Sequence, residues 1–115
     1  MSRSVLLQLA RDSIQEVIEA NNTIDHALLL EEHPLLSQKI STEIKIFIEN
    51  ELRGAHKIDE ARSLLENVII AAKKAAFEDK NFTPLTTSEY LRCYLEITLD
   101  TPEGVISQKD EPILG

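Results

Sequence analysis

The spacing of apolar residues changes several times along this chain, and those changes limit the folds open to it. Over residues 4–20 apolar side chains recur at three- and four-residue steps, which predicts an amphipathic helix. Around residues 43–49 they alternate with polar ones, with Ile44, Ile46 and Ile48 on one side, which predicts a half-buried strand. The helical spacing returns over residues 59–76, and alternation returns over 94–101. Helices and strands must therefore share one core.

Turn-forming residues predict where these elements begin and end. Asn21-Asn22 is expected to end the first helix, because Asn tolerates the left-handed conformation. Asn50-Glu51 is a plausible tight turn, and residues 52–56 are expected to return as the partner strand. Gly54 allows a bulge or a close backbone approach. Asp59 or Ser63 begins the second long helix, and Asp59 is the better cap.

Shorter elements complete the expected fold. Asp25 can cap a helix over residues 27–32, and one further turn is expected over residues 35–39. Thr86 and Glu89 fit a capping box that opens a helix over residues 87–92. Pro102 and Gly104 indicate that residues 102–115 form an irregular tail. We therefore predict one α+β domain over residues 1–115, with two long helices on one face of a small antiparallel-containing sheet of about three strands.

Composition excludes several classes of partner. The chain has 115 residues and a net charge of −8, so it is acidic, and nucleic acid and anionic membranes are disfavoured as partners. We find no apolar run long enough to span a bilayer and no signal peptide, so we expect a cytoplasmic protein. A single cysteine, Cys93, excludes an intramolecular disulfide.

Few residues have the spacing that catalytic or metal sites require. Cys93 lies outside any nucleophile motif, and a buried or half-buried thiol is the expected state. The histidines, His26, His33 and His56, do not form a ligand pair at helical spacing. We expect neither a metal site nor a cofactor.

Arg53, Gly54 and Glu96 are the candidate binding residues. A guanidinium beside a glycine can bind a carboxylate or phosphate while the backbone approaches closely. The structural alternative is that Arg53 pairs with an acidic neighbour such as Glu96 and that Gly54 serves a bulge. Glu96 interrupts an apolar strand, so it needs a partner if it faces inward.

Glu78, Asp79, Phe82 and Pro84 form a candidate interaction loop. They connect the second long helix to the capping box. A partner could recognise such a surface loop. The alternative is a helix stop in which Phe77 and Phe82 anchor the turn and Asp79 binds loop amides.

These motifs together resemble the AMMECR domain family. Residues 6–14, Leu-Leu-Gln-Leu-Ala-Arg-Asp-Ser-Ile, are similar to the opening helix of that family. Leu52-Arg53-Gly54 matches the start of its Leu-Arg-Gly-Cys-Ile-Gly signature. Residues 75–86 resemble its Ala-Ala-Phe-x-Asp-x-Arg-Phe-x-Pro-Leu-Thr segment. Residues 95–99 correspond to its strand with an internal acidic residue.

The chain also departs from the family pattern. Ala55, His56 and Lys57 replace the Cys, Ile and Gly of the signature, and Asn81 replaces an expected Arg. The family domain continues past this C-terminus, so the resemblance implies a shortened, divergent member.

Three hypotheses about function follow from the resemblance. The first is a non-catalytic interaction or accessory module that binds a protein partner or self-associates as a homodimer. The second is a subunit of a protein- or metabolite-modifying system associated with Memo-like or radical SAM proteins, in which Arg53 holds an anion and Glu96 acts as acid or base. The third is a remnant without its own function.

Overall fold

The structure, a computed structural model, describes residues 3–59 and 62–114. Over these residues the chain is α+β, as predicted, with four sheet strands rather than about three. In chain order the elements are α1 (Val5–Glu19), α2 (His26–Glu32), the 3-10 helix η1 (Pro34–Ser37), β1 (Ser41–Ile48), β2 (Glu51–Ile58), α3 (Leu64–Phe77), α4 (Thr87–Arg92), β3 (Tyr94–Thr101) and β4 (Gly104–Lys109).

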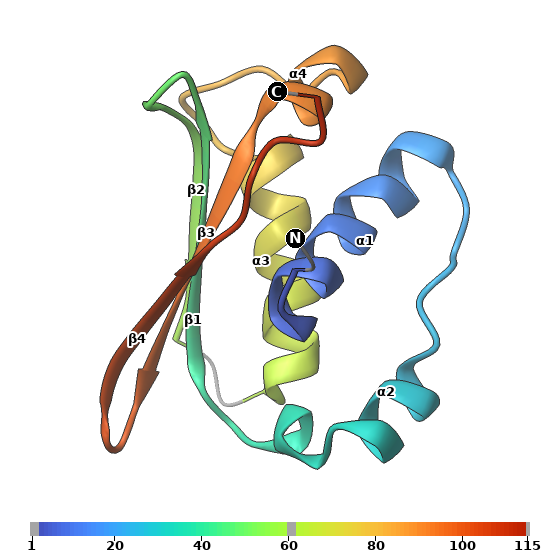
Figure 1. Cartoon of the computed structure of the whole chain (residues 1–115), viewed down its shortest axis with the longest axis vertical. Helices are drawn as coiled ribbons and strands as arrows, with labels where there is room; N and C mark the ends of the chain where they lie inside the picture. The colour runs from blue at the N-terminus through green and yellow to red at the C-terminus, as the bar shows by residue number, and fades with distance from the viewer. Residues whose placement is uncertain (1–2, 60–61, 115) are drawn as a thin grey trace.

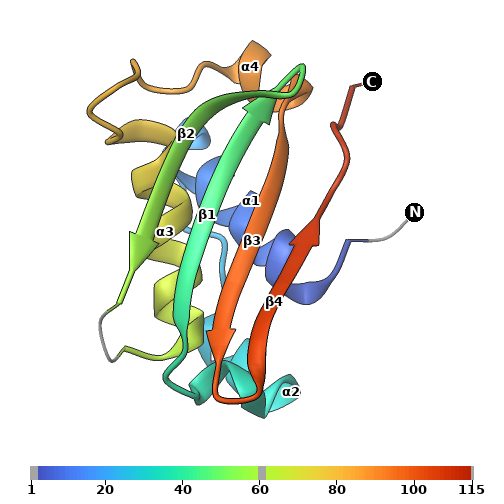
Figure 2. The same ribbon diagram turned by 90° about the vertical axis from the view of Figure 1, so that its left-hand side faces the viewer.

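The strands form one antiparallel sheet in the order β2-β1-β3-β4. Figure 1 shows α1 and α3 on one side of this sheet, as the sequence predicted. Helix α3 packs on β1 and β2, and α1 packs against α3. Figure 2 shows the other face of the sheet, which the described helices leave uncovered. The hydrophobic core therefore lies between the sheet and the two long helices.

Alternation along the central strands explains this single-sided core. Ile44 and Ile46 of β1 and Leu95 and Ile97 of β3 are almost completely buried. Successive strand residues point to opposite faces, so the polar residues between them face outward. Small side chains in α3, including Ala72, let the helix approach the sheet closely.

The β1–β2 turn lies one residue earlier than predicted. Glu49 and Asn50 are its central residues, and both have positive φ, at 51° and 68°. Two such residues define the hairpin turn whose twist matches that of the flanking strands. Asn adopts this conformation readily, but Glu does so at some cost.

Gly54 serves both roles that the sequence allowed. The β1–β2 register pairs Ile46 with Gly54 and Phe47 with Leu52, so Arg53 is the extra residue of a bulge. A Cβ atom on Gly54 would overlap the carbonyl oxygen of Ala75 and lie 3.2 Å from its carbonyl carbon. The glycine thus lets β2 contact the α3 backbone directly.

Two helix ends differ from the prediction. Ser63 rather than Asp59 caps α3, with its hydroxyl accepting the N–H of Glu66. Asp59 instead accepts the hydroxyl of Ser41 near the end of β2. Ala20 rather than Asn21 adopts the left-handed conformation after α1. The predicted caps Asp25 and Thr86 are confirmed, the latter in a complete capping box with Glu89.

The predicted irregular tail is wrong for residues 104–109, which form β4. Pro102 and Glu103 make a tight turn, after which Gly104, with φ 132°, begins the strand. The same residue types that end a structure also build hairpin turns, and local sequence did not separate the two cases. Beyond β4, Asp110 donates its N–H to Leu95 and Leu114 donates its N–H to Leu91, so the described tail also contacts the domain.

Candidate functional site at the edge of the sheet

The two most specific sequence motifs meet beside β2, the edge strand of the sheet. The bulge directs Arg53 toward α4 and the α3–α4 connection, where its guanidinium binds both carboxylate oxygens of Glu89. The Nε–Oε2 and Nη2–Oε1 distances are 2.8 and 3.0 Å. This forked geometry is the strongest that an arginine and a carboxylate form. Arg53 holds the pKa of Glu89 at about 2, with backbone and hydroxyl groups of Thr86 adding to the effect.

Phe82 and Asp79 join the same site from the α3–α4 connection. The Arg53 guanidinium lies 5.6 Å from the centre of the Phe82 ring, in a cation–π contact. Asp79 accepts the N–H of Asn81 at 2.8 Å and the N–H of Ala55 at 2.9 Å. These bonds, that of Asn81 first, lower the pKa of Asp79. The Ala55 N–H points away from β1, so Asp79 covers an edge donor of β2.

The structural alternative for Arg53, a pair with an acidic residue, is confirmed, but Glu96, the residue named as its example, is not the partner. Arg53 binds Glu89, whereas Glu96 lies on the outer face of β3, 3.6 Å from Lys109. Sequence reasoning had singled out Glu89 only as a helix cap. Its second role depends on the position of α4 relative to β2, which no local pattern records.

The four predicted loop residues have different environments. Asp79 and Phe82 are half-buried and contact β2, whereas Glu78 and Pro84 are exposed. Glu78 ends α3 by donating its N–H to Lys74. In this cluster of Arg53, Glu89, Phe82 and Asp79, the Glu89 carboxylate already takes the Nε and Nη2 donors of Arg53, so an external anion that binds the same two donors must displace it.

The Arg53–Glu89 pair predicts a specific dependence of stability on pH. Because folding lowers the pKa of Glu89 from 4.5 to about 2, its contribution is complete above about 4.5 and is lost as the pH falls toward 2. We expect Arg53→Met to lower the free energy of unfolding by about 1–2 kcal/mol at neutral pH, since both groups are partly exposed. The difference in free energy of unfolding between wild type and Arg53→Met should shrink as the pH falls from about 4.5 toward 2. Urea denaturation at several pH values measures it. Lys45→Met, which removes a looser pair of 3.9 Å with Glu43, is the control and should show a smaller change. A deficit of Arg53→Met that stays constant down to pH 2 would contradict this linkage.

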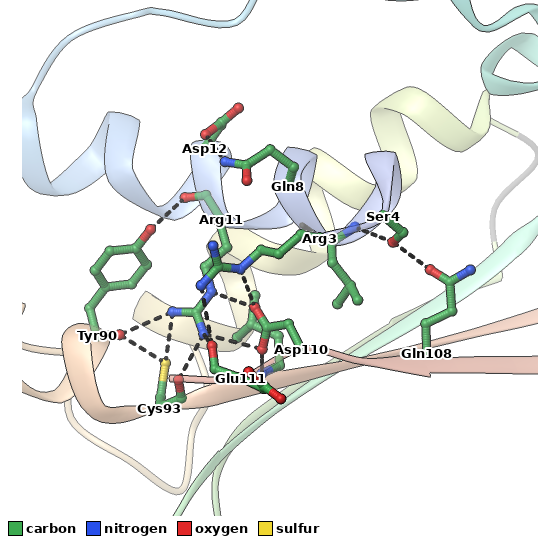
Figure 3. Close-up of polar contacts among 12 residues, drawn as sticks. Arg3, Ser4, Gln8, Arg11, Asp12, Tyr90, Cys93, Gln108, Asp110 and Glu111 are labelled. Carbon is green, nitrogen blue, oxygen red and sulfur yellow. Dashed lines mark hydrogen bonds and ion pairs between the residues drawn. The ribbon is translucent and has the colours of Figure 1, made fainter. Parts of the chain in front are cut away.

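A second polar cluster, which sequence reasoning missed, lies in the interior (Figure 3). Arg11 of α1 donates from Nε and Nη2 to the two carboxylate oxygens of Asp110, at 2.7 and 3.2 Å. Its Nη1 and Nη2 also donate to the carbonyl oxygens of Tyr90 and Cys93, at 3.1 and 2.7 Å. The side chains of Arg11 and Asp110 are both only 1% exposed. The cluster thus ties α1 to the α4–β3 junction and to the residue after β4.

Burial and charge shift the ionisation of this interior cluster. Burial is the largest single influence on Arg11 and opposes its charge, but the hydrogen bond to Asp110 and the electrostatic attraction of Cys93, Asp110 and Tyr90 together outweigh burial and raise the pKa of Arg11. Burial raises the pKa values of the Cys93 thiol and the Tyr90 hydroxyl, against the opposing effect of Arg11. Cys93 is completely buried. A buried thiol with a raised pKa is a poor nucleophile at neutral pH.

The sequence held a signal for this cluster in the position of Arg11. It lies four residues after Leu7 and three before Ile14, both of which are buried, so it shares their side of the helix. Glu16 is buried as well, and it accepts the N–H groups of Thr23 and Ile24 and pairs with Lys73. By contrast Val5 and Val17 are exposed, although both are apolar residues of the same helix.

Residues 3–59 and 62–114 contain neither a membrane-spanning helix nor a group of side chains suited to bind a metal ion. No helix in this part of the chain is both long and apolar enough to cross a bilayer. No group of three or more His, Cys, Asp or Glu side chains there is arranged to hold a metal ion.

Comparisons with known proteins place this geometry in context. The family model described as AMMECR1 matches residues 7–112. The crystal structure of an uncharacterised protein from Pyrococcus horikoshii is similar, with a TM-score of 0.74 and 26% sequence identity. The match covers 84% of this chain and 50% of that chain, so this chain spans half the length of its structural relative. No curated protein matches the sequence.

Proposed function

The chain belongs to the AMMECR1 family, and we propose that it is a non-catalytic accessory module that binds another protein along β4. This proposal rests on a difference between the two edge strands of the sheet: another segment bonds to β2 but none in the described residues bonds to the free side of β4. At the β2 edge, Asp79 takes up the Ala55 N–H and the α3–α4 connection lies alongside. At the β4 edge, no described segment pairs with the strand.

The backbone of β4 presents a regular set of free groups at this edge. Thr101 and Gly104 flank a two-residue turn, and Asp110 donates its N–H to Leu95. Hydrogen-bonded pairs alternate along an antiparallel ladder, so Gly104, Ile106 and Gln108 bond to β3. Val105, Ser107 and Lys109 then direct their N–H and C=O groups toward solvent. A strand from a partner can bond to these groups by extending the sheet.

The side chains of β4 are of the kind found in strands that pair with a partner. Val105 and Ile106 are 68% and 48% exposed, although both are apolar and strand-forming. Natural edge strands are commonly protected by a proline, a bulge or an inward-pointing charge, and Val105-Ile106-Ser107 carries none of these.

An apolar row crosses the uncovered sheet face from β3 to β2, away from the β4 edge. Phe47 stacks on Tyr94 with ring centres 5.1 Å apart, and Leu52, opposite Phe47, is 45% exposed. The remaining outward residues of β1 and β3 are mainly charged or polar. The uncovered face is therefore mostly polar, and its one apolar row lies outside the β4 edge.

The catalytic alternative has less support from the same geometry. Arg53 and Glu96, the residues it would use, are each paired with a different charged group, Glu89 and Lys109. An accessory role requires neither residue to be free.

The proposal predicts that blocking the β4 edge abolishes partner binding. Proline at position 107 removes an N–H that faces solvent, leaves the β3–β4 bonds intact and places a ring in the partner's path. We expect immobilised wild-type protein to retain a partner from an extract of the source organism, and Ser107→Pro to lose it. Isotope-labelled copies of this chain are added to the extract, so that capture of a second copy can be distinguished from the immobilised protein. Quantitative mass spectrometry then measures the amount of each retained protein.

Two control variants isolate the edge effect. Lys57→Pro makes the same change on β2, the opposite edge, and Ser107→Ala removes only the hydroxyl contact with Thr98. Both should retain the partner. If wild type and Ser107→Pro retain the same proteins in the same amounts, β4 is not the binding edge and the proposal fails.

A further inference from the structure

We infer that the strand that pairs with β4 is the β4 of a second copy of this chain, in an antiparallel arrangement with a two-fold axis at Ile106. This inference rests on the proposed function and specifies its partner. The two sheets would join into one continuous sheet with both helical layers on the same side. Such an interface uses the same surface of each copy twice, as two-fold symmetry requires.

The free backbone groups fit this register. With Ile106 opposite its own copy, Val105 of one chain lies opposite Ser107 of the other. Both residues direct their N–H and C=O groups to the free edge, so they form a hydrogen-bonded pair. Ile106 bonds to β3 within its own chain, and the axis therefore passes through a pair that needs no bonds between copies. No backbone N–H group at the centre of this interface is therefore left without a hydrogen-bond partner.

An axis at Ile106 brings opposite charges together near the ends of β4. An axis at either adjacent residue, Val105 or Ser107, does not. Glu103, in the turn just before β4, lies three residues before Ile106, and Lys109, the last residue of β4, lies three residues after it, so each Glu103 would lie near the Lys109 of the other copy. Moving the axis to Ser107 would place Glu103 opposite Glu111, a like-charge pair. Moving it to Val105 would place Lys109 opposite Thr101, without a charge partner.

The apolar side chains gain burial in the same arrangement. Ile106 is opposite Leu99 of β3 and faces the helical side of the sheet, yet remains 48% exposed. Across the axis it would pack against its own copy. Val105, which is on the outer face, would pack beside Ser107 of the other chain. One six-residue strand buries less than a standard interface, and each copy carries a charge of −8, so we expect a weak, concentration-dependent dimer.

Sedimentation equilibrium of the full chain tests the dimer directly. The wild-type mass should rise from monomer toward dimer as protein concentration increases into the range of hundreds of micromolar, typical of weak interfaces. Ser107→Pro should remain a monomer at every concentration, whereas Lys57→Pro should behave as wild type. Circular dichroism of each variant verifies that it is folded.

Charge exchange tests the register. Glu103→Lys alone and Lys109→Glu alone should each weaken the dimer by at least several-fold, because each places like charges opposite each other. The double exchange, Glu103→Lys with Lys109→Glu, should restore most of the affinity, and the remaining deficit reflects the lost pair of Lys109 with Glu96 in the same chain. A double variant that stays as weak as the single ones would overturn the assigned register.

Disulfide trapping gives a second test of the axis. Ile106→Cys places two thiols in a non-hydrogen-bonded pair, a spacing that a disulfide can bridge, and should form covalent dimers on oxidation. Val105→Cys alone should cross-link more slowly than a mixture of Val105→Cys and Ser107→Cys chains. The native Cys93 is buried and should contribute little background. Equal cross-linking of all single variants would contradict an axis at Ile106.

The results also separate this inference from the proposed function. A wild-type chain that stays monomeric overturns self-association. If that monomer still retains a different protein that Ser107→Pro loses, β4 remains a docking edge with another partner. If it shows no binding that depends on Ser107, both proposals fail.

Discussion

Replacing Asp110 with asparagine is expected to lower the free energy of unfolding by about 3–5 kcal/mol, because it leaves the buried Arg11 charge without its counter-ion. The substitution hardly changes the volume, so the effect reports charge and hydrogen bonding rather than packing. Asp110 also accepts the N–H of Leu95 at 2.7 Å and the guanidinium of Arg3 at 2.9 Å. Urea denaturation at neutral pH measures the change.

Arg3→Gln provides a matched control at the same carboxylate. Arg3 binds Asp110 as Arg11 does, but its side chain is 24% exposed and remains partly hydrated. We expect this change to cost no more than about 1 kcal/mol. A loss as large as that of Asp110→Asn would show that burial of Arg11 is not the cause.

A double variant separates the cost of an unpaired charge from the net value of the pair. Arg11→Met with Asp110→Leu removes both charges, and we expect it to be more stable than either single variant. If the two losses simply add, the residues are not energetically coupled and the ion pair does not explain the effect.

Gly54→Ala is expected to cost about 3 kcal/mol or more, because the new methyl group would overlap the backbone of α3. The obstructing atom is the carbonyl oxygen of Ala75, which cannot move as a side chain can. Relief requires a shift of α3 or opening of the β2 bulge, and either change disturbs the core. Thermal and urea denaturation of the purified variant measure this loss.

The neighbouring outward position supplies the comparison. Ala55 lies opposite Lys45 and faces away from α3, so Ala55→Thr should change stability by less than about 0.5 kcal/mol. Ala75→Gly should not rescue Gly54→Ala, because it leaves the carbonyl group in place. Wild-type stability in Gly54→Ala would show that the close approach of β2 and α3 is not needed.

Local patterns predicted the elements whose burial follows one simple period. The strands around Ile44 and Ile97 alternate cleanly because the helices cover only one sheet face. Strand β4 escaped prediction because its residues are exposed on both sides, except Gln108, so no alternation marks them. Exposure of an edge strand depends on what lies beside it, and sequence spacing does not report this.

In the candidate site too, local motifs identified some residues, whereas the contacts between distant residues became known only from the structure. Arg53, Gly54, Asp79 and Phe82 were singled out from sequence, and the structure brings them together at the β2 edge. Glu89 was missed as the partner of Arg53, because thirty-six residues separate the two. The choice of Glu96 instead rested on its unusual place in an apolar strand, although that side chain faces outward.

The sequence by itself determined the α+β class, the two long helices, the central strands and the family, because these follow from periodicities and motifs carried within short segments. Only the tertiary structure decided which charges meet, which glycine touches a helix and which sheet edge stays open. Those features depend on residues far apart in the chain, such as Arg11 and Asp110, whose proximity is set by how whole elements pack. The open β4 edge, and with it the proposed binding surface, is a property of that packing.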